Sequence, residues 1–350
     1  MPAKSYYQRL AFTFLIGVVG ALAAHVVRLP IPWLLGSMLL CAVAQLVRVP
    51  LQMPPARLER IMRVVVGVTL GPAVAASLLH NAADLPLAIL SATLVTTVMV
   101  VIGTLWFRRY ADVHDSSAFL MSLPGGLSML LAMAGDVGNR PQVLFVHTVR
   151  VFSLLIFVSL LARFLGVSSE HGFISMSFDI NTTSSWLLLF ALVAVGYLLS
   201  ENLKIPGAHV LLPMGLTAAL VITTPLVIDP PELFKTVAML VFGCVLGLEI
   251  AAGPKATYSK LLGLSLAFTA TAIALGAGFA WGLSYSVSPS FLVLFLALAP
   301  GGIAEVSLVA LALGLDVGLV ALIHACRFLF IVVAGPLGLG VIRKKSDVSE

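Results

Sequence analysis

The sequence predicts an all-α polytopic membrane protein with two homologous halves, and three observations carry this prediction. The 350 residues are 60% hydrophobic and only 10% charged, with a mean hydropathy of +1.10. Apolar stretches long enough to cross a bilayer follow one another along the chain. Short motifs recur in the same order at a nearly constant distance, and the prolines of two Pro-Gly-Gly motifs, Pro124 and Pro300, lie 176 residues apart.

The composition excludes a water-soluble fold. Soluble domains carry roughly 25% charged residues, and a soluble chain of this size could not bury so much apolar surface. The net charge of +5 is typical of membrane proteins, which gather Lys and Arg in their cytoplasmic loops. Because no basic face with interleaved aromatic residues is visible, we expect the lipid bilayer and not nucleic acid as a partner. Homo-oligomerisation is left open.

Twelve apolar segments of about 17–25 residues qualify as membrane-spanning helices. They run over 11–27, 31–47, 61–79, 85–107, 116–135 and 141–165 in the first half, and over 186–200, 205–223, 233–252, 260–284, 290–313 and 316–342 in the second. This pattern predicts a membrane repeat over 10–165, a polar linker over 166–185, a second membrane repeat over 186–342 and a cytoplasmic tail over 343–350.

The two halves match each other through motifs in the same order. Pro30 matches Pro206, "VGVTLG" at 66 matches "FGCVLG" at 242, and "HTVR" at 147 matches "HACR" at 324, with one inserted residue. Each match alone is weak, but the ordered set indicates a duplication over nearly the whole chain. Two membrane halves of about six segments are a recurrent plan of secondary transporters.

The loop charges indicate that the second half is inverted relative to the first. Arg108 and Arg109 precede the first Pro-Gly-Gly segment, whereas the equivalent loop "SYSVSPS" has no basic residue. Conversely, "LLHNAADLP" has no Lys or Arg, whereas its equivalent "AAGPKATYSK" has Lys255 and Lys260. Since basic residues collect on the cytoplasmic side, the bias changes sides between the copies. Ten crossings, with both Pro-Gly-Gly segments re-entrant, and twelve crossings both stay open.

The two Pro-Gly-Gly motifs predict interrupted helices. The residues are Pro124, Gly125 and Gly126 in the first copy and Pro300, Gly301 and Gly302 in the second. Proline removes a backbone donor and clashes with the preceding turn, and in lipid such a break must face protein or a watery cavity. Breaks at matching positions in two halves mark a transporter site, so we expect a solute or ion site there. The alternative is a kink that only permits close packing.

Five polar residues inside apolar segments are further site candidates. His147 and Arg150 share one helical face, and His324 and Arg327 repeat the pattern. A buried arginine costs a few kcal/mol even on the mildest scale, so these pairs predict anion or proton handling near the breaks. The alternative is a structural pair that bonds helix carbonyls, or an arginine that snorkels to the interface. Glu305 follows the second break and either pairs with Arg327 or Arg150 or carries a proton.

Residues with catalytic or metal-binding chemistry form no recognisable motif. There is no H-E-x-x-H, Walker loop or G-x-S-x-G, and Cys41, Cys244 and Cys326 all lie in apolar stretches. The cysteines therefore resemble small buried hydrophobes rather than a disulfide framework or metal ligands. We expect no enzyme activity, no catalytic residues, no cofactor and no metal site.

The paired Pro-Gly-Gly motifs, together with "LPIPWLLGSML" and "KIPGAHVLLPMG" early in each half, resemble the bacterial AbrB membrane protein family with its internal duplication. The second copy departs from "PWLLG" with "HVLLP". The family is distantly similar to inverted-repeat transporters of the cation–proton antiporter and bile-acid symporter group, in which broken helices cross at a central site. It also carries the labels ammonia monooxygenase and regulator of aidB expression. A monooxygenase would need copper or iron ligands, and no such cluster is visible.

The resemblance and the residues together predict a multi-pass protein of the bacterial inner membrane. We expect a secondary transporter or exporter of a small solute, coupled to H⁺ or Na⁺, with its site at the two breaks. The alternative is a membrane-embedded sensor that affects gene expression indirectly. The sequence leaves the solute and the coupling ion open.

Overall fold

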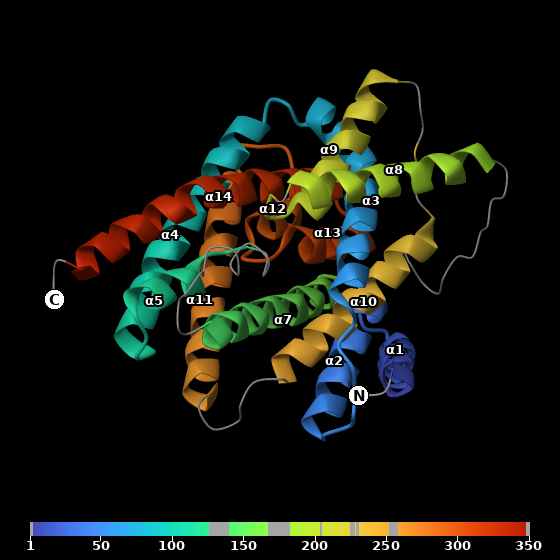
Figure 1. The fold of residues 1–350 in the computed structure, drawn as a ribbon. Coiled ribbons are helices and arrows are strands. Elements are labelled where there is room, and N and C mark those ends of the chain that lie inside the picture. Colours follow the sequence, from blue (N-terminus) through green and yellow to red (C-terminus); the bar gives the residue numbers. More distant parts are fainter. Residues whose placement is uncertain are drawn as a thin grey trace. The chain divides into compact units, whose positions relative to one another are not determined.

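The computed structural model describes residues 3–125, 140–166, 183–203, 205–224, 228, 231–251 and 258–347. Within these residues the regular structure consists of thirteen α-helices and no strand (Figure 1). The helices are α1 (Ala3–Val26), α2 (Pro32–Leu46), α3 (Ala56–His80), α4 (Leu85–Tyr110), α5 (Asp115–Ser122), α7 (Arg140–Phe164), α8 (Thr183–Leu203), α9 (Ala208–Thr223), α10 (Glu232–Ala251), α11 (Tyr258–Leu283), α12 (Phe291–Leu298), α13 (Ile303–Ala312) and α14 (Val317–Asp347).

Seven of the described helices are long and apolar enough to cross a bilayer, namely α1, α3, α4, α7, α10, α11 and α14. The remaining apolar helices are shorter, including α2, α8, α9 and α13. A helix satisfies its own backbone hydrogen bonds, which is the requirement for crossing hydrocarbon. The prediction of an all-α polytopic membrane protein is therefore confirmed.

Most predicted segments agree with a helix to within a few residues, and the differences lie at the Pro-Gly-Gly motifs and the ends. The segment 290–313 is two helices, α12 and α13. The segment 116–135 begins as α5, which ends at Ser122, and residues 126–135 lie outside the described residues. Of the linker 166–185, residues 167–182 lie outside them, and α8 already starts at Thr183. The predicted tail over 343–350 is helical as far as Asp347, since Arg343, Lys344 and Lys345 favour helix.

The chain forms two compact units, and each unit takes helices from both halves of the sequence. Unit 1 comprises residues 1–77, 155–252 and 307–318, and unit 2 comprises residues 78–154, 253–306 and 319–350. Unit 1 thus contains α1, α2, α3, α8, α9 and α10, and unit 2 contains α4, α5, α11 and α12 with the first part of α7 and most of α14.

In unit 1, α2 packs against both α1 and α10 (Figure 1). Gly20 on α1 and Gly36 on α2 face each other so closely that a Cβ on either would overlap the carbonyl oxygen of the other. Small residues let helix backbones approach in this way in membrane proteins. On the other helices of the unit, Val64 and Val68 of α3 form a buried cluster with Leu189 and Leu192 of α8.

The short helices α2 and α9 begin with the same unusual backbone conformation. Ile31, the residue before α2, has φ 55°, and Gly207, the residue before α9, has φ 73°. The two positions lie 176 residues apart, which is the spacing of the sequence repeat. Glycine adopts this left-handed conformation readily, whereas a β-branched residue adopts it only under strain. The turn geometry is therefore shared between the copies although the residue type is not.

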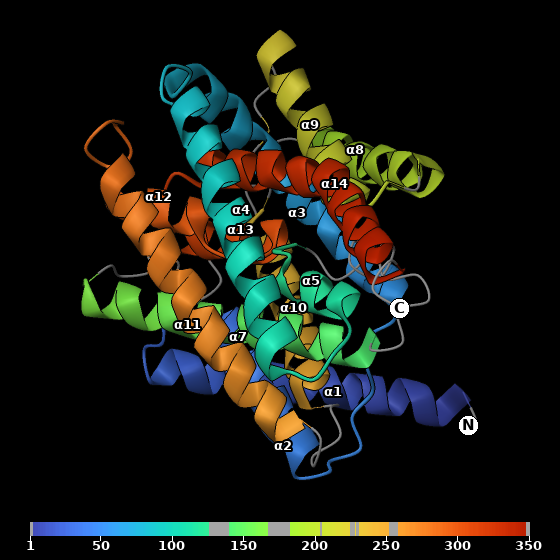
Figure 2. The same ribbon diagram turned by 90° about the vertical axis from the view of Figure 1, so that its left-hand side faces the viewer.

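In unit 2, α4 and α11 run side by side and α5 and α12 pack onto them (Figure 2). The rings of Phe107 and Phe268 contact each other edge to face with centroids 5.2 Å apart. The hydroxyls of Thr104 on α4 and Ser122 on α5 lie 3.0 Å apart. The hydroxyl contact holds the carboxyl end of α5, just before the first Pro-Gly-Gly motif.

Candidate functional site

The second Pro-Gly-Gly motif separates α12 from α13. Ala299 is extended, with φ −61° and ψ 147°, because a following proline disfavours the helical conformation. The Gly301 N–H donates to the Ala299 carbonyl at 2.9 Å and closes a three-residue turn around Pro300. The Gly302 carbonyl then accepts from Val306 N–H at 3.2 Å, which starts α13. The predicted helix interruption is confirmed here.

The first motif ends α5 in the same way. Leu123, the residue before Pro124, is extended with φ −61° and ψ 125°. Pro124 is buried and Gly125 half-buried. Gly126, a predicted site residue, lies outside the described residues. The first interruption is therefore observed as far as Gly125.

At the second break, His324 and Arg327 of α14 bond the backbone of α12 and the turn. The Arg327 guanidinium donates to the carbonyls on both sides of Pro300, with Nη1 at 2.6 Å from Ala299 O and Nη2 at 2.9 Å from Gly301 O. Nη2 also lies 2.7 Å from His324 Nδ1. Because Nδ1 accepts this bond, the imidazole carries its proton on Nε2, which donates to Leu296 O at 2.9 Å.

At the first break, His147 and Arg150 of α7 repeat this arrangement. His147 Nε2 lies 3.0 Å from Leu120 O, and Arg150 Nη2 donates to Leu123 O at 2.9 Å and to His147 Nδ1. Arg150 Nη1 makes a longer contact of 3.5 Å to Met121 O. Leu120 and Leu296 lie 176 residues apart, as do Leu123 and Ala299, so the paired residues accept the same bonds.

These contacts explain why two arginines can remain buried. Arg150 is 1% exposed and Arg327 is 3% exposed. The last carbonyls of a helix have no intrahelical partner and carry partial negative charge, which a guanidinium satisfies. The contacts agree with the alternative that the pairs bond helix carbonyls, and a direct role in solute binding stays a prediction.

Within unit 2, α7 and α14 each contact the broken segment of the other copy. A Cβ on Gly301 would lie 3.0 Å from Leu154 Cδ2, so α7, which bonds the first break, also contacts the second. A Cβ on Gly338 of α14 would lie 2.8 Å from Phe119 Cζ, so α14, which bonds the second break, also contacts α5. The fold therefore brings together residues of both predicted groups that lie far apart in the sequence.

Glu305 lies in the first turn of α13. Its Oε2 sits against Gly302, where a Cβ would overlap it. A carboxylate in the first turn is favourable because the amino end of a helix carries partial positive charge, and a glutamate at this position can reach back to the start of the helix. Pairing of Glu305 with Arg150 or Arg327 stays a prediction.

Several buried polar atoms on the helices that form or bond the two breaks have no hydrogen-bond partner in the described part of the chain. In the first copy they are Arg150 Nε, Ser117 Oγ on α5 and Gln142 Oε1 on α7, and in the second copy Ser307 Oγ on α13. Each such atom costs about 1–3 kcal/mol if it stays unsatisfied. The positions that match Ser117 and Gln142 in the second copy are Val293 and Leu319. The sequence analysis did not predict these additional polar residues of the first copy, although a residue-by-residue comparison of the two copies could have identified them.

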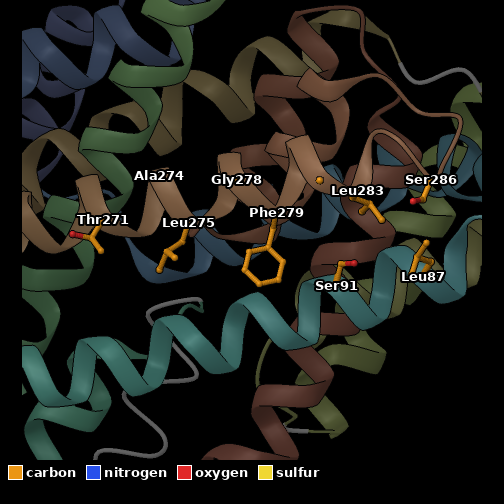
Figure 3. Close-up of a pocket in the computed structure, with 10 residues that line it drawn as sticks. Leu87, Ser91, Thr271, Ala274, Leu275, Gly278, Phe279, Leu283 and Ser286 are labelled. Carbon is orange, nitrogen blue, oxygen red and sulfur yellow. The ribbon is translucent and has the colours of Figure 1, made fainter.

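A separate groove of about 750 Å³ lies between α4 and α11 (Figure 3). Its lining includes Ser91 on α4 and Thr271, Gly278 and Phe279 on α11, with the Phe279 ring directed toward α4. The lining contains no residue of either break. The sequence analysis did not predict the groove. A pattern that could have indicated it is the row of small residues Ala274, Gly278 and Gly282, which lie at every fourth position of α11.

The sequence comparisons agree with this architecture. A family model described as "Transition state regulatory protein AbrB" matches residues 33–343. The chain belongs to the AbrB family. The match spans both Pro-Gly-Gly motifs and both His/Arg pairs, so the AbrB resemblance seen in the sequence is confirmed.

Among AbrB relatives, the chain is 27% identical over 341 residues to the Escherichia coli (strain K12) protein named "Putative regulator AbrB". The alignment covers 96% of this chain and 96% of that protein. The chain is thus a polytopic helical membrane protein of the AbrB family, similar along its whole length to a protein whose name describes regulation.

Proposed function

We propose that this AbrB-family protein is a secondary transporter or exporter of a small polar solute in the bacterial inner membrane. The observation that carries the proposal is the pair of helix breaks in unit 2, each bonded by the same His/Arg arrangement. Irregular backbone at membrane depth is tolerated only where it faces protein or a watery cavity. Broken helices at corresponding positions of two halves mark binding sites in transporters.

The proposed solute is polar because polar atoms on α5 and α7 have no hydrogen-bond partner in the described part of the chain and could bond a solute. Arg150 Nε offers a donor, and the Ser117 hydroxyl can donate or accept. Glu305 beside the second break supplies a group that can carry a proton, so we propose coupling to H⁺, with Na⁺ as the alternative. We propose no chemical conversion of the solute, since the residues of the site serve to bond backbone and to hold polar groups.

Flux measurements test this proposal. The chain is reconstituted in liposomes and screened with radiolabelled amino acids, carboxylates and amines under an imposed proton or sodium gradient. In the Gly301→Ala variant the new methyl group would overlap Val306 Cγ2 and press on Leu154. Overpacking forces backbone shifts, so we expect the turn around Pro300 to move and flux of the transported solute to fall below that of the unmodified chain.

The matched control is Gly263→Ala on α11, where no heavy atom of the described chain lies within 4 Å of the new Cβ. This variant should transport like the unmodified chain. Equal flux in both variants would show that the second break is not on the solute path. Thermal unfolding of each variant in detergent verifies that the protein is folded.

A second candidate function is favoured by the names of the relatives, which describe regulation. In this alternative the chain senses a solute and affects gene expression without net transport. Transcript levels in cells that produce the Gly301→Ala variant separate the two. A variant that loses flux but keeps normal transcript levels supports transport, whereas altered transcripts in the absence of any measurable flux support sensing.

A further inference from the structure

Two of the three cysteines meet in the interior of unit 1, on helices from opposite halves of the sequence. Cys41 lies on α2 and Cys244 on α10, and both are fully buried. Each thiol donates to the carbonyl oxygen of Thr13 on α1, at 3.8 Å from Cys41 Sγ and 4.0 Å from Cys244 Sγ. Both sulfur atoms therefore lie within 4.0 Å of the same oxygen atom.

The surrounding glycines create this meeting point. A Cβ on Gly17 of α1 would lie 2.5 Å from Cys244 Sγ, so the glycine leaves the space that the thiol occupies. A Cβ on Gly247 of α10 would lie 3.0 Å from Cys41 Cβ, which shows how closely α10 approaches α2 at this level. A cysteine that only fills space needs no second thiol, whereas here three helices converge to bring two thiols together.

Two thiols that share one acceptor oxygen lie on the same side of the helix–helix contact and face a common point. A disulfide requires an S–S distance of about 2.05 Å and Cβ atoms roughly 3.5–4.5 Å apart. The Thr13 carbonyl that accepts from both thiols lies within α1, where it keeps its helical hydrogen bond when the thiol protons leave.

We infer that Cys41 and Cys244 form a redox-active dithiol that closes to a disulfide between α2 and α10 when a small peroxide reaches it. One sulfur attacks hydrogen peroxide, the O–O bond breaks, and the first water leaves with that thiol's proton to give a sulfenic acid. The second sulfur attacks the sulfenic sulfur, the S–O bond breaks, and the hydroxyl leaves with the second proton as water. The two sulfurs lose two electrons in total and the peroxide gains them.

The disulfide would fix a helix of the first half to a helix of the second half. Since Cys41 and Cys244 both belong to unit 1, the bond would stiffen that unit and leave the His/Arg arrangement of unit 2 untouched. The inference therefore does not depend on the proposed transport function.

The third cysteine makes a sharp test possible. The chain has three cysteines, so the Cys326→Ser variant retains only the pair in question. This variant is purified in detergent, treated with hydrogen peroxide for seconds to hours, the approximate range of disulfide formation, and then denatured for thiol counting. We expect loss of both thiols, their recovery after dithiothreitol, a linked peptide containing Cys41 and Cys244 in mass spectrometry, and a higher unfolding temperature of the oxidised protein.

The controls add Cys41→Ser or Cys244→Ser to the same background and should give no linked peptide within one chain. The inference is overturned if both thiols of the folded chain remain countable after peroxide treatment while the denatured chain forms the bond. It is equally overturned if the folded chain yields only sulfinic or sulfonic acids and no linked peptide, because the two sulfurs are then not placed to react with each other.

Discussion

At the scale of single residues, the two buried arginines differ in how fully they are bonded. Arg327 donates to Ala299 O, Gly301 O and His324 Nδ1, and makes a longer contact of 3.4 Å to Leu298 O. Arg150 makes fewer bonds to carbonyls and keeps Nε without a partner in the described part of the chain. Arg327 therefore makes more bonds to the backbone than Arg150, and the proposed solute contact belongs to Arg150.

This difference predicts unequal stability losses. Arg327→Leu removes two close bonds between a charged group and buried carbonyls, which costs about 3–6 kcal/mol at roughly 1.5–3 kcal/mol each. Arg150→Leu removes one close bond of this kind, so we expect a loss of about 1.5–3 kcal/mol. Chemical unfolding of the detergent-solubilised protein measures both losses. Arg327→Lys should recover only part of the stability, because an ammonium cannot bridge two carbonyls as a guanidinium fork does.

Arg163 provides the control for these substitutions. It lies at the other end of α7 and is exposed, with one contact of 3.4 Å to Val27 O. Arg163→Leu should change the free energy of unfolding by less than about 1 kcal/mol, as for most exposed positions. A larger loss for Arg150→Leu than for Arg327→Leu would contradict the assignment of the two roles.

At the scale of helices, close approach depends on glycines that stand opposite backbone. Gly36 of α2 faces Gly20 of α1, and neither backbone can move away from a new Cβ as a flexible side chain could. The same α2 also packs on α10. The three helices therefore hold one another at a spacing that larger residues would not permit.

Replacing one of these glycines should destabilise unit 1. We expect Gly36→Ala to cost about 1–3 kcal/mol through overpacking and to lower the unfolding temperature in detergent. Gly215→Ala on α9 is the matched control, because no heavy atom of the described chain lies within 4 Å of its new Cβ. Alanine favours a helix interior over glycine by roughly 0.5–1 kcal/mol, so this variant should be at least as stable as the original. A Gly36→Ala variant as stable as Gly215→Ala would refute the packing argument.

At the scale of the whole molecule, each compact unit is assembled from both halves of the chain. Neither half is therefore a folding domain by itself, although the halves match in sequence. The loop charges add the proposal that the second half is inverted in the membrane, since the basic residues change sides between copies.

Accessibility labelling tests the inversion. In a background with all three cysteines replaced by serine, Arg108→Cys at the end of α4 and Tyr285→Cys just after α11 report on equivalent ends of the two copies. Both native side chains are exposed. With a membrane-impermeant maleimide on intact cells and on inverted vesicles, an inverted pair should place the two labels on opposite faces. Labelling of both from the same face would show parallel halves.

The sequence alone determined the class of the molecule and the location of its helix breaks. Hydropathy and segment length decide that apolar helices cross a bilayer. A proline followed by two glycines interrupts a helix locally, so α12 ends beside Pro300 as expected, whereas the single prolines Pro72, Pro213 and Pro336 lie inside helices. These features depend on neighbouring residues only and can be read from the chain.

Only the tertiary structure decided what the polar residues touch. Three features depend on helices far apart in sequence: Arg327 spans the carbonyls around Pro300, Ser117 and Arg150 have atoms without a partner among the described residues, and Cys41 and Cys244 share the Thr13 carbonyl as acceptor. The spacing of apolar residues indicates which face of a helix is buried, but it does not indicate which other helix packs against that face. The physical reason is that a hydrogen bond between helices requires atoms placed to within a few tenths of an ångström, and only the packing of the folded chain sets those positions.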